Sequence, residues 1–319
     1  MNRSIFFTAA LAATLLPAQS LSGPTPGMAF DGASRSLRAV VGSFGSAALG
    51  PVVLGGLDFA SSQRTRGIAC QKDQCFFVAG LGSEQVERAA IADQVDVPEG
   101  AAWSEDGQVV AIYSRSQQWI RVLPFAGEAG AQQNISSLGG QLTAVEVSPD
   151  GKKVVFAIAG DHSGVYELRD GTFVPVLAAD RPVDLTYSAN GQTLFVLAGS
   201  RISAIDADGI MQSWPLDAVQ DGIGVQPGLD SAGRDVLYVA GRGDHALFVY
   251  DGATHALLEQ ISLNFAPSQI QPSGTGSYLL TSRTNEDELL WSYTVGRGAF
   301  FVPASPVENS GLPQRKVRR

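Results

Sequence analysis

The sequence predicts an all-β fold in which a four-stranded unit is repeated around a closed ring, and three observations predict it. Apolar runs centred on polar turns recur along the chain with a period near 40 residues. Each recurrence divides into four short runs rich in β-branched and aromatic residues, with glycine, aspartate or asparagine between them. Beyond the first twenty residues, no window combines a sustained helical apolar period with helix caps. These features are typical of a β-propeller with four-stranded antiparallel blades.

The repeat is clearest from residue 142 onward. One pattern is shared by LTAVEVSPDGKKVVFAIAG (142–160), VDLTYSANGQTLFVLAG (183–199), GLDSAGRDVLYVAG (228–241) and QPSGTGSYLLTSR (271–283). It extends backwards to GAAWSEDGQVVAIYS (100–114) and RGIACQKDQCFFVAG (66–80). The aligned turn residues are Asp73, Gly107, Gly151, Gly191, Gly233 and Gly276, at intervals of 34, 44, 40, 42 and 43. Apart from the first interval, this spacing is that of propeller blades.

Residues 182–216 indicate why each unit contains four strands. They hold the runs VDLTYS, QTLFVLAG, RISAIDAD and IMQSWPL, separated by breaks that contain NG, GS and DG. Such breaks supply the positive φ that tight hairpins require, so consecutive runs pair antiparallel. A single sheet of this kind is apolar on both faces and buries them only by stacking against neighbouring sheets.

The number of blades follows from the lengths. Five units fill residues 98–303 at about 41 residues each, and the 74 residues from 24 to 97 hold a little under two more. We therefore expect a single propeller domain over residues 24–303 with seven blades, and six remain the alternative. The stretch AFDGASRSLRAVVG (29–42) matches VYDGATHALLEQIS (249–262), the third and fourth strands of a later unit. This match predicts that the N-terminal hairpin finishes a blade, or fills one shared across the closure.

The repeat resembles that of a known family. LYVAGRGDHALFVYDGATHALLEQISL (237–263) and VEVSPDGKKVVFAIAG (145–160) look like the YVTN-type repeats of secreted and surface-layer propellers. These repeats are related in pattern to lactonase-type and WD-repeat propellers, although the WD dipeptide is missing here. The resemblance covers most of residues 60–303 and is strongest over 142–303. It implies the fold but hardly an activity, because propellers of this type include hydrolases as well as binding scaffolds.

The first twenty residues, MNRSIFFTAALAATLLPAQS, predict a secretory signal peptide. Arg3 precedes an apolar run from Ile5 to Leu16, and Ala18-Gln19-Ser20 provides small residues for cleavage. A retained anchor is the alternative interpretation, but the run is shorter than the span of a bilayer, and no later window reaches that length. We expect a secreted or periplasmic protein without membrane insertion.

The charge of the chain is unevenly distributed. The net charge is −9, and the segment 304–319 contributes +3 through Arg315, Lys316, Arg318 and Arg319 against Glu308. Without Arg3 and this segment, the remaining body carries −13. An acidic body repels phosphate backbones, so nucleic acid is not an expected partner. The basic segment contains Pro, Ser and Gly but no apolar period, and we interpret it as a disordered tail rather than as a contact for an anionic surface.

Two cysteines, Cys70 and Cys75 in IACQKDQCFF, are the only ones in the chain. Four residues separate them, between two apolar runs, so the pair is expected to face each other across a hairpin turn. In an oxidising compartment this favours a disulfide that closes a small loop. A metal site lacks a second pair of ligands, and a redox-active pair lacks the CxxC spacing and the helix that lower a thiol pKa.

Candidate binding residues are expected on one rim of the propeller. In each blade, the turn between the second and third strands and the start of the innermost strand lie on the same rim, where propellers commonly bind ligands. The candidates in the turns are Asp161, His162, Arg242, Asp244, His245 and Arg283, with Glu286, Asp287 and Glu288. Those at the strand starts are Glu99, Gln141, Arg181 and Asp221.

These residue types allow two interpretations each. The two histidines, each beside an aspartate, form either a shared metal or acid–base pair or two exposed loop residues on different blades. The second interpretation is favoured, because nothing in the sequence brings the side chains together. The three arginines either grip an anionic substrate or form surface ion pairs, and the ion pairs explain them equally well.

The sequence therefore favours a binding or protein-interaction module over an enzyme. No nucleophile–base pair, metal-ligand set or cofactor motif is recognisable, so we expect neither a catalytic centre nor a cofactor or metal. The expected partner is a protein, a glycan or a small ligand, bound by a monomer. The alternative is a hydrolase of the lactonase type acting on a lactone or ester, which depends on the resemblance alone.

Overall fold

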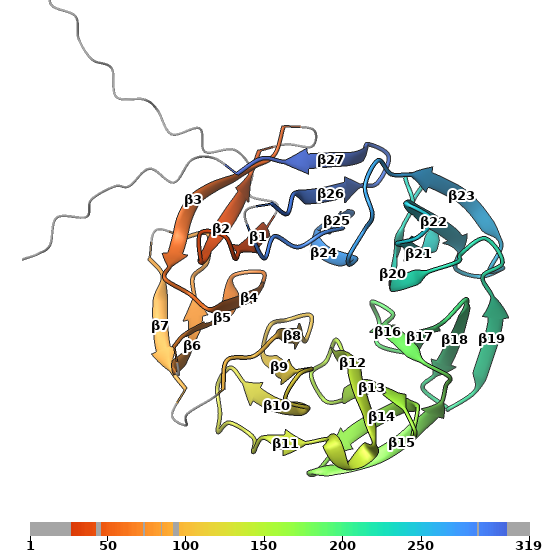
Figure 1. The fold of residues 1–319 in the computed structure, drawn as a ribbon, viewed down its shortest axis with the longest axis horizontal. Coiled ribbons are helices and arrows are strands. Elements are labelled where there is room, and N and C mark those ends of the chain that lie inside the picture. The colour runs from red at the N-terminus through yellow and green to blue at the C-terminus, as the bar shows by residue number, and fades with distance from the viewer. Residues whose placement is uncertain are drawn as a thin grey trace, which may run out of the picture.

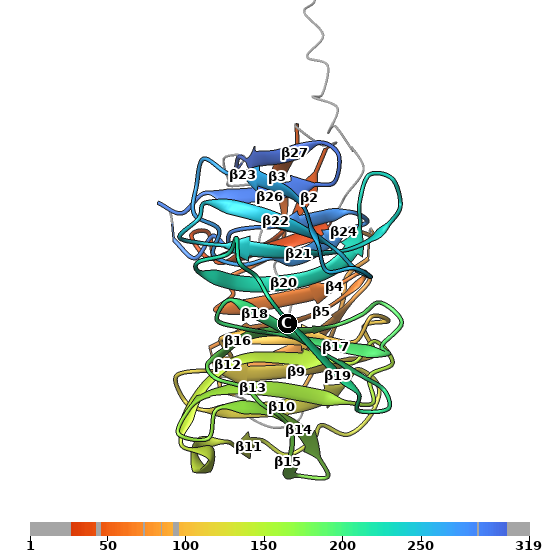
Figure 2. The same ribbon diagram turned by 90° about the vertical axis from the view of Figure 1, so that its right-hand side faces the viewer.

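A computed structural model of the chain describes residues 27–42, 46–72, 74–83, 85–91, 96–285 and 287–304. Their strands form seven sheets arranged as blades around a common axis (Figure 1). Seen from the side, the strands run across the thickness of the ring (Figure 2). Within the described ranges the only helical element is a 3-10 turn at Ser136–Leu138, and no helix there is long and apolar enough to cross a membrane. The predicted all-β propeller with seven blades is confirmed, and six blades are excluded.

The blades follow one another in chain order, and six of the seven have four antiparallel strands. Blade 1 contains β1 (Gly27–Asp31), β2 (Ser36–Val41) and β3 (Ala48–Gly55). Blade 2 contains β4 (Phe59–Gln63), β5 (Arg66–Gln71), β6 (Gln74–Ala79) and β7 (Glu87–Ala90). Blade 3 contains β8 (Gly100–Trp103), β9 (Val109–Ser114), β10 (Trp119–Pro124) and β11 (Gln133–Asn134).

The remaining blades lie in the part of the chain where the repeat is clearest. Blade 4 contains β12 (Gly140–Val147), β13 (Val154–Gly160), β14 (Gly164–Arg169) and β15 (Thr172–Ala178). Blade 5 contains β16 (Pro182–Tyr187), β17 (Thr193–Ala198), β18 (Arg201–Asp206) and β19 (Met211–Pro215). Blade 6 contains β20 (Gly222–Leu229), β21 (Asp235–Gly241), β22 (Ala246–Asp251) and β23 (Leu257–Ser262). Blade 7 contains β24 (Gln271–Gly274), β25 (Ser277–Leu279), β26 (Leu290–Thr294) and β27 (Gly298–Val302).

The apolar core is distributed over the seams between blades. Each of the seven seams has its own cluster of buried side chains, contributed by both neighbouring sheets. Phe156 of blade 4, for example, packs with Ile120 of blade 3, and all of its side chain is buried. Burial of such a side chain stabilises the fold by about 1.5 to 3 kcal/mol, so each blade depends on both of its neighbours.

The predicted turns between first and second strands are confirmed in five blades. The glycines at these turns have φ between +64° and +80°, a conformation that favours glycine; they are Gly107, Gly151, Gly191, Gly233 and Gly276. In blades 3, 4 and 5 a serine hydroxyl stabilises the turn by donating to the Asp or Asn two residues on and accepting the N–H five residues on. These sets are Ser104 with Asp106 and Val109, Ser148 with Asp150 and Lys153, and Ser188 with Asn190 and Thr193.

The prediction that Asp73 occupies the same turn in blade 2 is wrong. Residue 73 itself lies outside the described residues, but it falls between β5 and β6, the second and third strands. The turn between the first and second strands instead contains Arg64, with φ of +54°. Arg64 lies 43 residues before Gly107, so the irregular interval of 34 came from a turn on the opposite rim.

The two rims can now be defined. The upper rim carries the turns that follow β5, β9, β13, β17, β21 and β25 and the starts of the next innermost strands. The lower rim carries the turns between first and second strands and those between third and fourth strands. The Cys70–Cys75 hairpin and the predicted binding residues all belong to the upper rim.

The N-terminal hairpin occupies a different place from the one its sequence match predicts. Gly27 packs against the carbonyl of Ser273, and Gly32 donates its N–H to Arg283 O at 2.8 Å. β1 therefore runs in the same direction as β25, the second strand of blade 7. By direction, β1 and β2 correspond to the second and third strands of a blade, and the match to the third and fourth strands is wrong by one strand. Both hairpins alternate apolar residues in the same way, so the local pattern did not distinguish them.

Blade 1 closes the ring against blade 7. Leu49 N donates to Pro303 O at 2.8 Å, which places Ala304 beside β3 in a parallel bridge. Leu49 and Val302 are among the buried residues of this seam. The predicted signal peptide, 1–20, and the rest of the predicted basic tail, 305–319, lie outside the described residues.

A buried ionic network reinforces the closing seam. Asp31, only 1% exposed, lies 3.4 Å from Arg38 of β2 and 3.1 Å from Arg283 of blade 7. Arg38 also donates to the carbonyls of Gly50 and Leu49 on β3. The guanidinium of Arg38 is thus balanced by a carboxylate and by backbone acceptors, as a buried charge requires.

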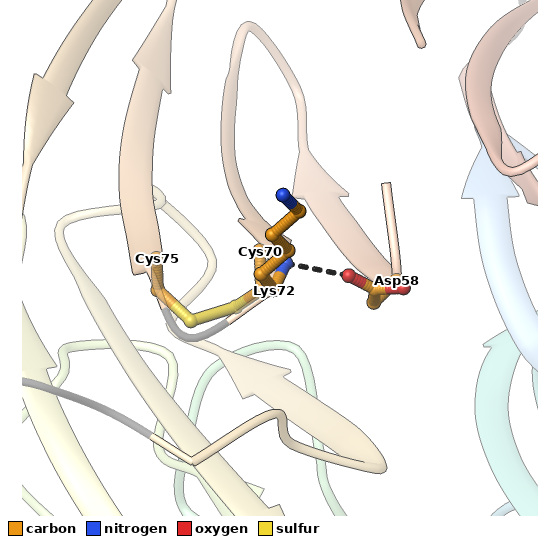
Figure 3. Close-up of a disulfide and its surroundings, with 4 residues drawn as sticks. All are labelled: Asp58, Cys70, Lys72 and Cys75. Carbon is orange, nitrogen blue, oxygen red and sulfur yellow. Dashed lines mark hydrogen bonds between the residues drawn. A yellow bond between two sulfur atoms is a disulfide. The ribbon is translucent and has the colours of Figure 1, made fainter. Parts of the chain in front are cut away.

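The predicted disulfide is present in the β5–β6 hairpin (Figure 3). Cys70 and Cys75 are directly paired across the two strands, with their Cα atoms 4.0 Å apart, and both are fully buried. Beside them, Lys72 N donates to Asp58 Oδ2 at 2.6 Å, and Asp58 also pairs with Arg35 of blade 1. Asp58 therefore connects the β5–β6 hairpin of blade 2 to Arg35 of blade 1 at the upper rim.

The disulfide is testable by mass spectrometry. Protein from an oxidising compartment is expected to take up no alkylating label without reductant and two labels after unfolding with reductant. The double variant Cys70→Ser/Cys75→Ser is expected to lose about 2 kcal/mol of unfolding free energy, because the closed loop is short. Two labels taken up by the unfolded protein without reductant would contradict the pairing.

The closing network predicts a large difference between two ion pairs. Asp31→Ala removes the carboxylate that the buried Arg38 and Arg283 share, and it is expected to lower the unfolding free energy by about 3 to 5 kcal/mol in denaturant titrations. Glu105→Ala is the matched control, because it breaks the Arg64–Glu105 pair, whose side chains are 62% and 56% exposed. That change is expected to cost less than about 1 kcal/mol. Equal losses in the two variants would show that the network does not stabilise the closure.

Candidate functional site

The upper rim of blade 4 is hollowed by an open depression of about 530 Å³. Its lining comes from the β13–β14 turn, from β14, from the end of β15 and from the segment that leads to β16. The lining residues are Asp161, His162, Ser163, Tyr166, Ala178, Ala179 and Asp180. The carboxylates of Asp161 and Asp180 and the imidazole of His162 are exposed, so a ligand entering from solvent can reach them.

Local contacts hold this depression in shape. Tyr166 OH donates to the His162 carbonyl at 2.9 Å, and its ring stacks on the buried Phe156. Ser163 Oγ accepts the N–H groups of Gly160 and Arg181, each at 3.2 Å. The positions of these walls are therefore set by the blade and not by a ligand.

The structure brings three of the predicted residues together here. Asp161 and His162 line the depression, and Arg181 follows its last lining residue, with Arg181 Nε 3.8 Å from Asp180 Oδ1. Both members of this pair are more than four-fifths exposed, so their interaction is weak. Asp180, Ser163 and Tyr166 were not predicted, because their contribution depends on where β14 begins and where β15 ends.

Four other predicted residues form a second group, on blade 6. Arg242 N donates to Asp221 O at 2.9 Å, and Asp244 Oδ2 accepts the N–H of Gln220 at 3.0 Å. His245 follows in the same turn, with φ of +48°. Asp221 and Asp244 therefore connect the start of β20 to the β21–β22 turn, which is a structural role.

The predicted set does not converge on one centre. Blade 5 separates the group on blade 4 from the group on blade 6, so His162 and His245 lie on different blades. Arg283 belongs to the closing network with Asp31 and is 17% exposed. Within the described residues, no three His, Cys, Asp or Glu side chains are grouped to hold a metal ion.

Among the other rim residues, Glu99 and Glu288 accept hydrogen bonds within the rim. Glu99 accepts hydrogen bonds from Ser114 and from the backbone N–H groups of Arg115 and Ser116. Burial alone would raise its pKa, but these hydrogen bonds lower the pKa below its usual value. Glu288 similarly accepts from Thr284, while residue 286 lies outside the described residues.

Two titratable residues that were not predicted lie on innermost strands. Glu146 belongs to β12 and Asp184 to β16, and protein atoms surround both carboxyl groups although water still reaches part of each side chain. Burial, together with the Asp184 carboxyl, raises the pKa of Glu146 to about 8. Burial raises the pKa of Asp184 to about 7, against the Val225 and Leu185 N–H groups and the Arg115 charge, which lower it. The available signal was an acid inside each apolar run, LTAVEV and VDLTY.

Comparison with known proteins shows that this chain is similar in fold to several solved structures. No protein-family model and no curated protein matches the chain. The dihydro-heme d1 dehydrogenase NirN, solved in complex with DHE, has a TM-score of 0.57 and 14% identity over 91% of this chain and 66% of its own. This chain therefore spans just under two thirds of that protein.

Two further solved structures share the architecture. The β-propeller domain of Cps50 (Swd1) from Myceliophteria thermophila has a TM-score of 0.57 and 14% identity, covering 79% of this chain and 87% of its own. A functionally unknown protein from Desulfotomaculum acetoxidans DSM 771 has a TM-score of 0.53 and 14% identity, covering 75% and 79%. At this identity the similarity shows a propeller fold and carries no activity over to this chain.

Proposed function

We propose that this protein is an exported binding module whose ligand occupies the depression on the upper rim of blade 4. The observation that carries the proposal is the convergence of Asp161, His162 and Asp180 with the ring of Tyr166 at one concave surface. The apolar run and small-residue exit of the first twenty residues support export. The YVTN-type pattern of the repeat supports a secreted scaffold.

The chemistry of the depression suits a ligand that presents a positive charge, such as a lysine or arginine side chain of a partner protein. Asp161 and Asp180 supply two exposed carboxylates, and aromatic rings such as that of Tyr166 attract cations through their faces. The net charge of −9 steers cationic partners toward the protein. An open depression with rigid walls favours recognition of a protruding side chain.

One observation favours the lactonase-type hydrolase as a second candidate. Asp184 lies on the innermost strand β16, and burial raises its pKa to about 7 although the charge of Arg115 lowers it. Carboxyl groups with shifted pKa values serve as general bases in hydrolases. Hydrolysis of a simple lactone that Asp184→Asn abolishes, without loss of the fold, would support this candidate.

The binding function is tested by affinity capture with immobilised protein from an envelope fraction of the source organism. Wild type is expected to retain a partner that Asp161→Asn/Asp180→Asn retains at least about tenfold less, because two carboxylates contribute a few tenths to 1 kcal/mol each and act together. Retention is expected to fall as salt is raised. Cross-linking to Tyr166 peptides would place the partner at the depression.

The matched control is Asp170→Asn/Asp208→Asn, which removes the same charge from two exposed turn residues on the lower rim. It is expected to capture the partner as wild type does. Equal loss in both double variants would show that net charge and not the depression is responsible. Retention that neither variant changes would reject the depression as the binding site.

A further inference from the structure

The lower-rim turn of blade 5 contains Asn190-Gly191, the only Asn-Gly pair in the chain. Asn190 is exposed, and its side-chain Nδ2 has no hydrogen-bond partner among the described residues. An asparagine side chain that precedes a glycine is open to attack by the next backbone nitrogen, because glycine has no Cβ to hinder the approach. The turn therefore holds both reacting groups of a covalent rearrangement.

Two hydrogen-bond donors are directed at the side-chain carbonyl of Asn190. The Ser188 hydroxyl donates to Asn190 Oδ1 at 2.8 Å, and the N–H of Gln192 donates to the same atom at 3.0 Å. Donors in this position polarise the carbonyl and stabilise the negative charge that develops on its oxygen when a nucleophile attacks the carbon. The turn thus holds Oδ1 inside and leaves Nδ2, the leaving group, on the solvent side.

The nitrogen of Gly191 is held by one hydrogen bond. Its N–H donates to Ser188 O at 2.8 Å, in a turn where Gly191 has φ of +70°. This hydrogen bond has to open before the nitrogen loses its proton and attacks, so the folded turn slows the reaction relative to an unfolded chain. An exposed turn on a rim opens locally while the blade stays folded, so the reaction is slowed and not prevented.

The same turn carries an aspartate in two other blades. In blade 3, Asp106 Oδ1 accepts from the serine two residues before it at 2.7 Å and from the N–H two residues after it at 2.9 Å. In blade 4, Asp150 Oδ1 accepts from the equivalent groups at 2.7 Å and 3.2 Å. The hydrogen bonds lower the pKa of both carboxyl groups, chiefly through the N–H at Asp106 and through the serine at Asp150, whose pKa falls to about 2. A carboxylate at position 190 would meet the same pair of donors.

We propose that Asn190 is a site of self-catalysed deamidation, at which the turn of blade 5 converts its asparagine to the aspartate that blades 3 and 4 carry. The nitrogen of Gly191 attacks Cγ of Asn190 and gives up its proton, the bond between N and Cγ forms, the Cγ–Nδ2 bond breaks and ammonia leaves. Water then opens the cyclic imide. Addition at Cγ gives aspartate, whereas addition at the backbone carbonyl carbon of residue 190 gives isoaspartate. In either case one water is consumed and one ammonia released, without oxidation or reduction.

Only the aspartate product fits the turn. It keeps the backbone path and an oxygen at the position of Oδ1, between the donors of Ser188 and Gln192. Isoaspartate adds a methylene to the backbone and moves Gly191 away from Ser188 O, so the hydrogen bond that closes the turn is lost. We therefore expect the aspartate form to be as stable as the original chain and the isoaspartate form to be less stable.

Peptide mapping by mass spectrometry tests the site in the intact, folded protein. During incubation in mildly alkaline buffer, the gain in mass from amide to acid is expected at Asn190 at least about tenfold faster than at Asn134 and Asn264. These two asparagines are exposed internal controls, because the side chains of Ile135 and Phe265 hinder the attack of the following nitrogen. Equal conversion at the three positions would overturn the proposal. So would an unchanged Asn190 in the folded protein after a synthetic peptide of residues 183–199 has been converted.

Two substitutions at position 190 test whether the turn accepts the product. Asn190→Asp is expected to keep the unfolding free energy of wild type, because the acceptor for Ser188 and Gln192 is retained. Asn190→Ala is the matched control, which removes that acceptor and is expected to unfold at a lower denaturant concentration. Equal destabilisation by the two substitutions would show that the turn does not accept the aspartate.

Gly191→Ala tests the chemistry itself. The added Cβ is expected to slow conversion at Asn190 at least about tenfold. In the folded protein this Cβ would also lie 3.3 Å from Pro149 of blade 4, so the same substitution is measured in the synthetic peptide, where packing plays no part. Conversion at the wild-type rate in the altered peptide would exclude attack by the nitrogen of residue 191.

Discussion

Burial of both faces of every blade is the constraint on which this structure depends. Each sheet is apolar on its two sides, and each of the seven seams contains a cluster of side chains from both neighbours. A chain of such sheets leaves two uncovered faces unless its first and last blades meet. The seam between blades 1 and 7, with Leu49 and Val302 in its core, therefore decides whether the fold exists at all. The backbone hydrogen bonds and the Asp31 network at that seam fix the relative position of blades 1 and 7, which apolar packing alone does not specify.

The buried ionic network lies at the closing seam and joins the first blade to the last. Asp31 lies between two arginines, Arg38 of its own blade and Arg283 of blade 7. A buried carboxylate that is paired in this way fixes how the two blades meet, because removing either partner would leave a buried charge without its counterpart.

The two rims differ in how much they vary from blade to blade. On the lower rim, blades 3, 4 and 5 share one turn, in which a serine and an acid or amide close the turn at a glycine, as at Ser148, Asp150 and Gly151. The upper rim varies from blade to blade. It carries a disulfide on blade 2, the hydrogen-bonded carboxylate of Glu99 on blade 3 and the open depression on blade 4. Variation on a rigid repeated frame is the usual basis of recognition in such folds.

The sequence by itself determined the repeated unit and the hairpin that joins Cys70 to Cys75, because these depend on local periodicity and turn chemistry. It favoured seven blades over six, and the structure decided between them. The sequence also placed Asp161 and His162 on the correct rim. The tertiary structure decided the direction of the N-terminal hairpin, the rim of the turn at residue 73 and the burial of Arg283. Each of these depends on which blade lies next to which, and on where the ring closes. A period of about 40 residues carries no information on either point, because every blade presents the same alternating pattern to its neighbours.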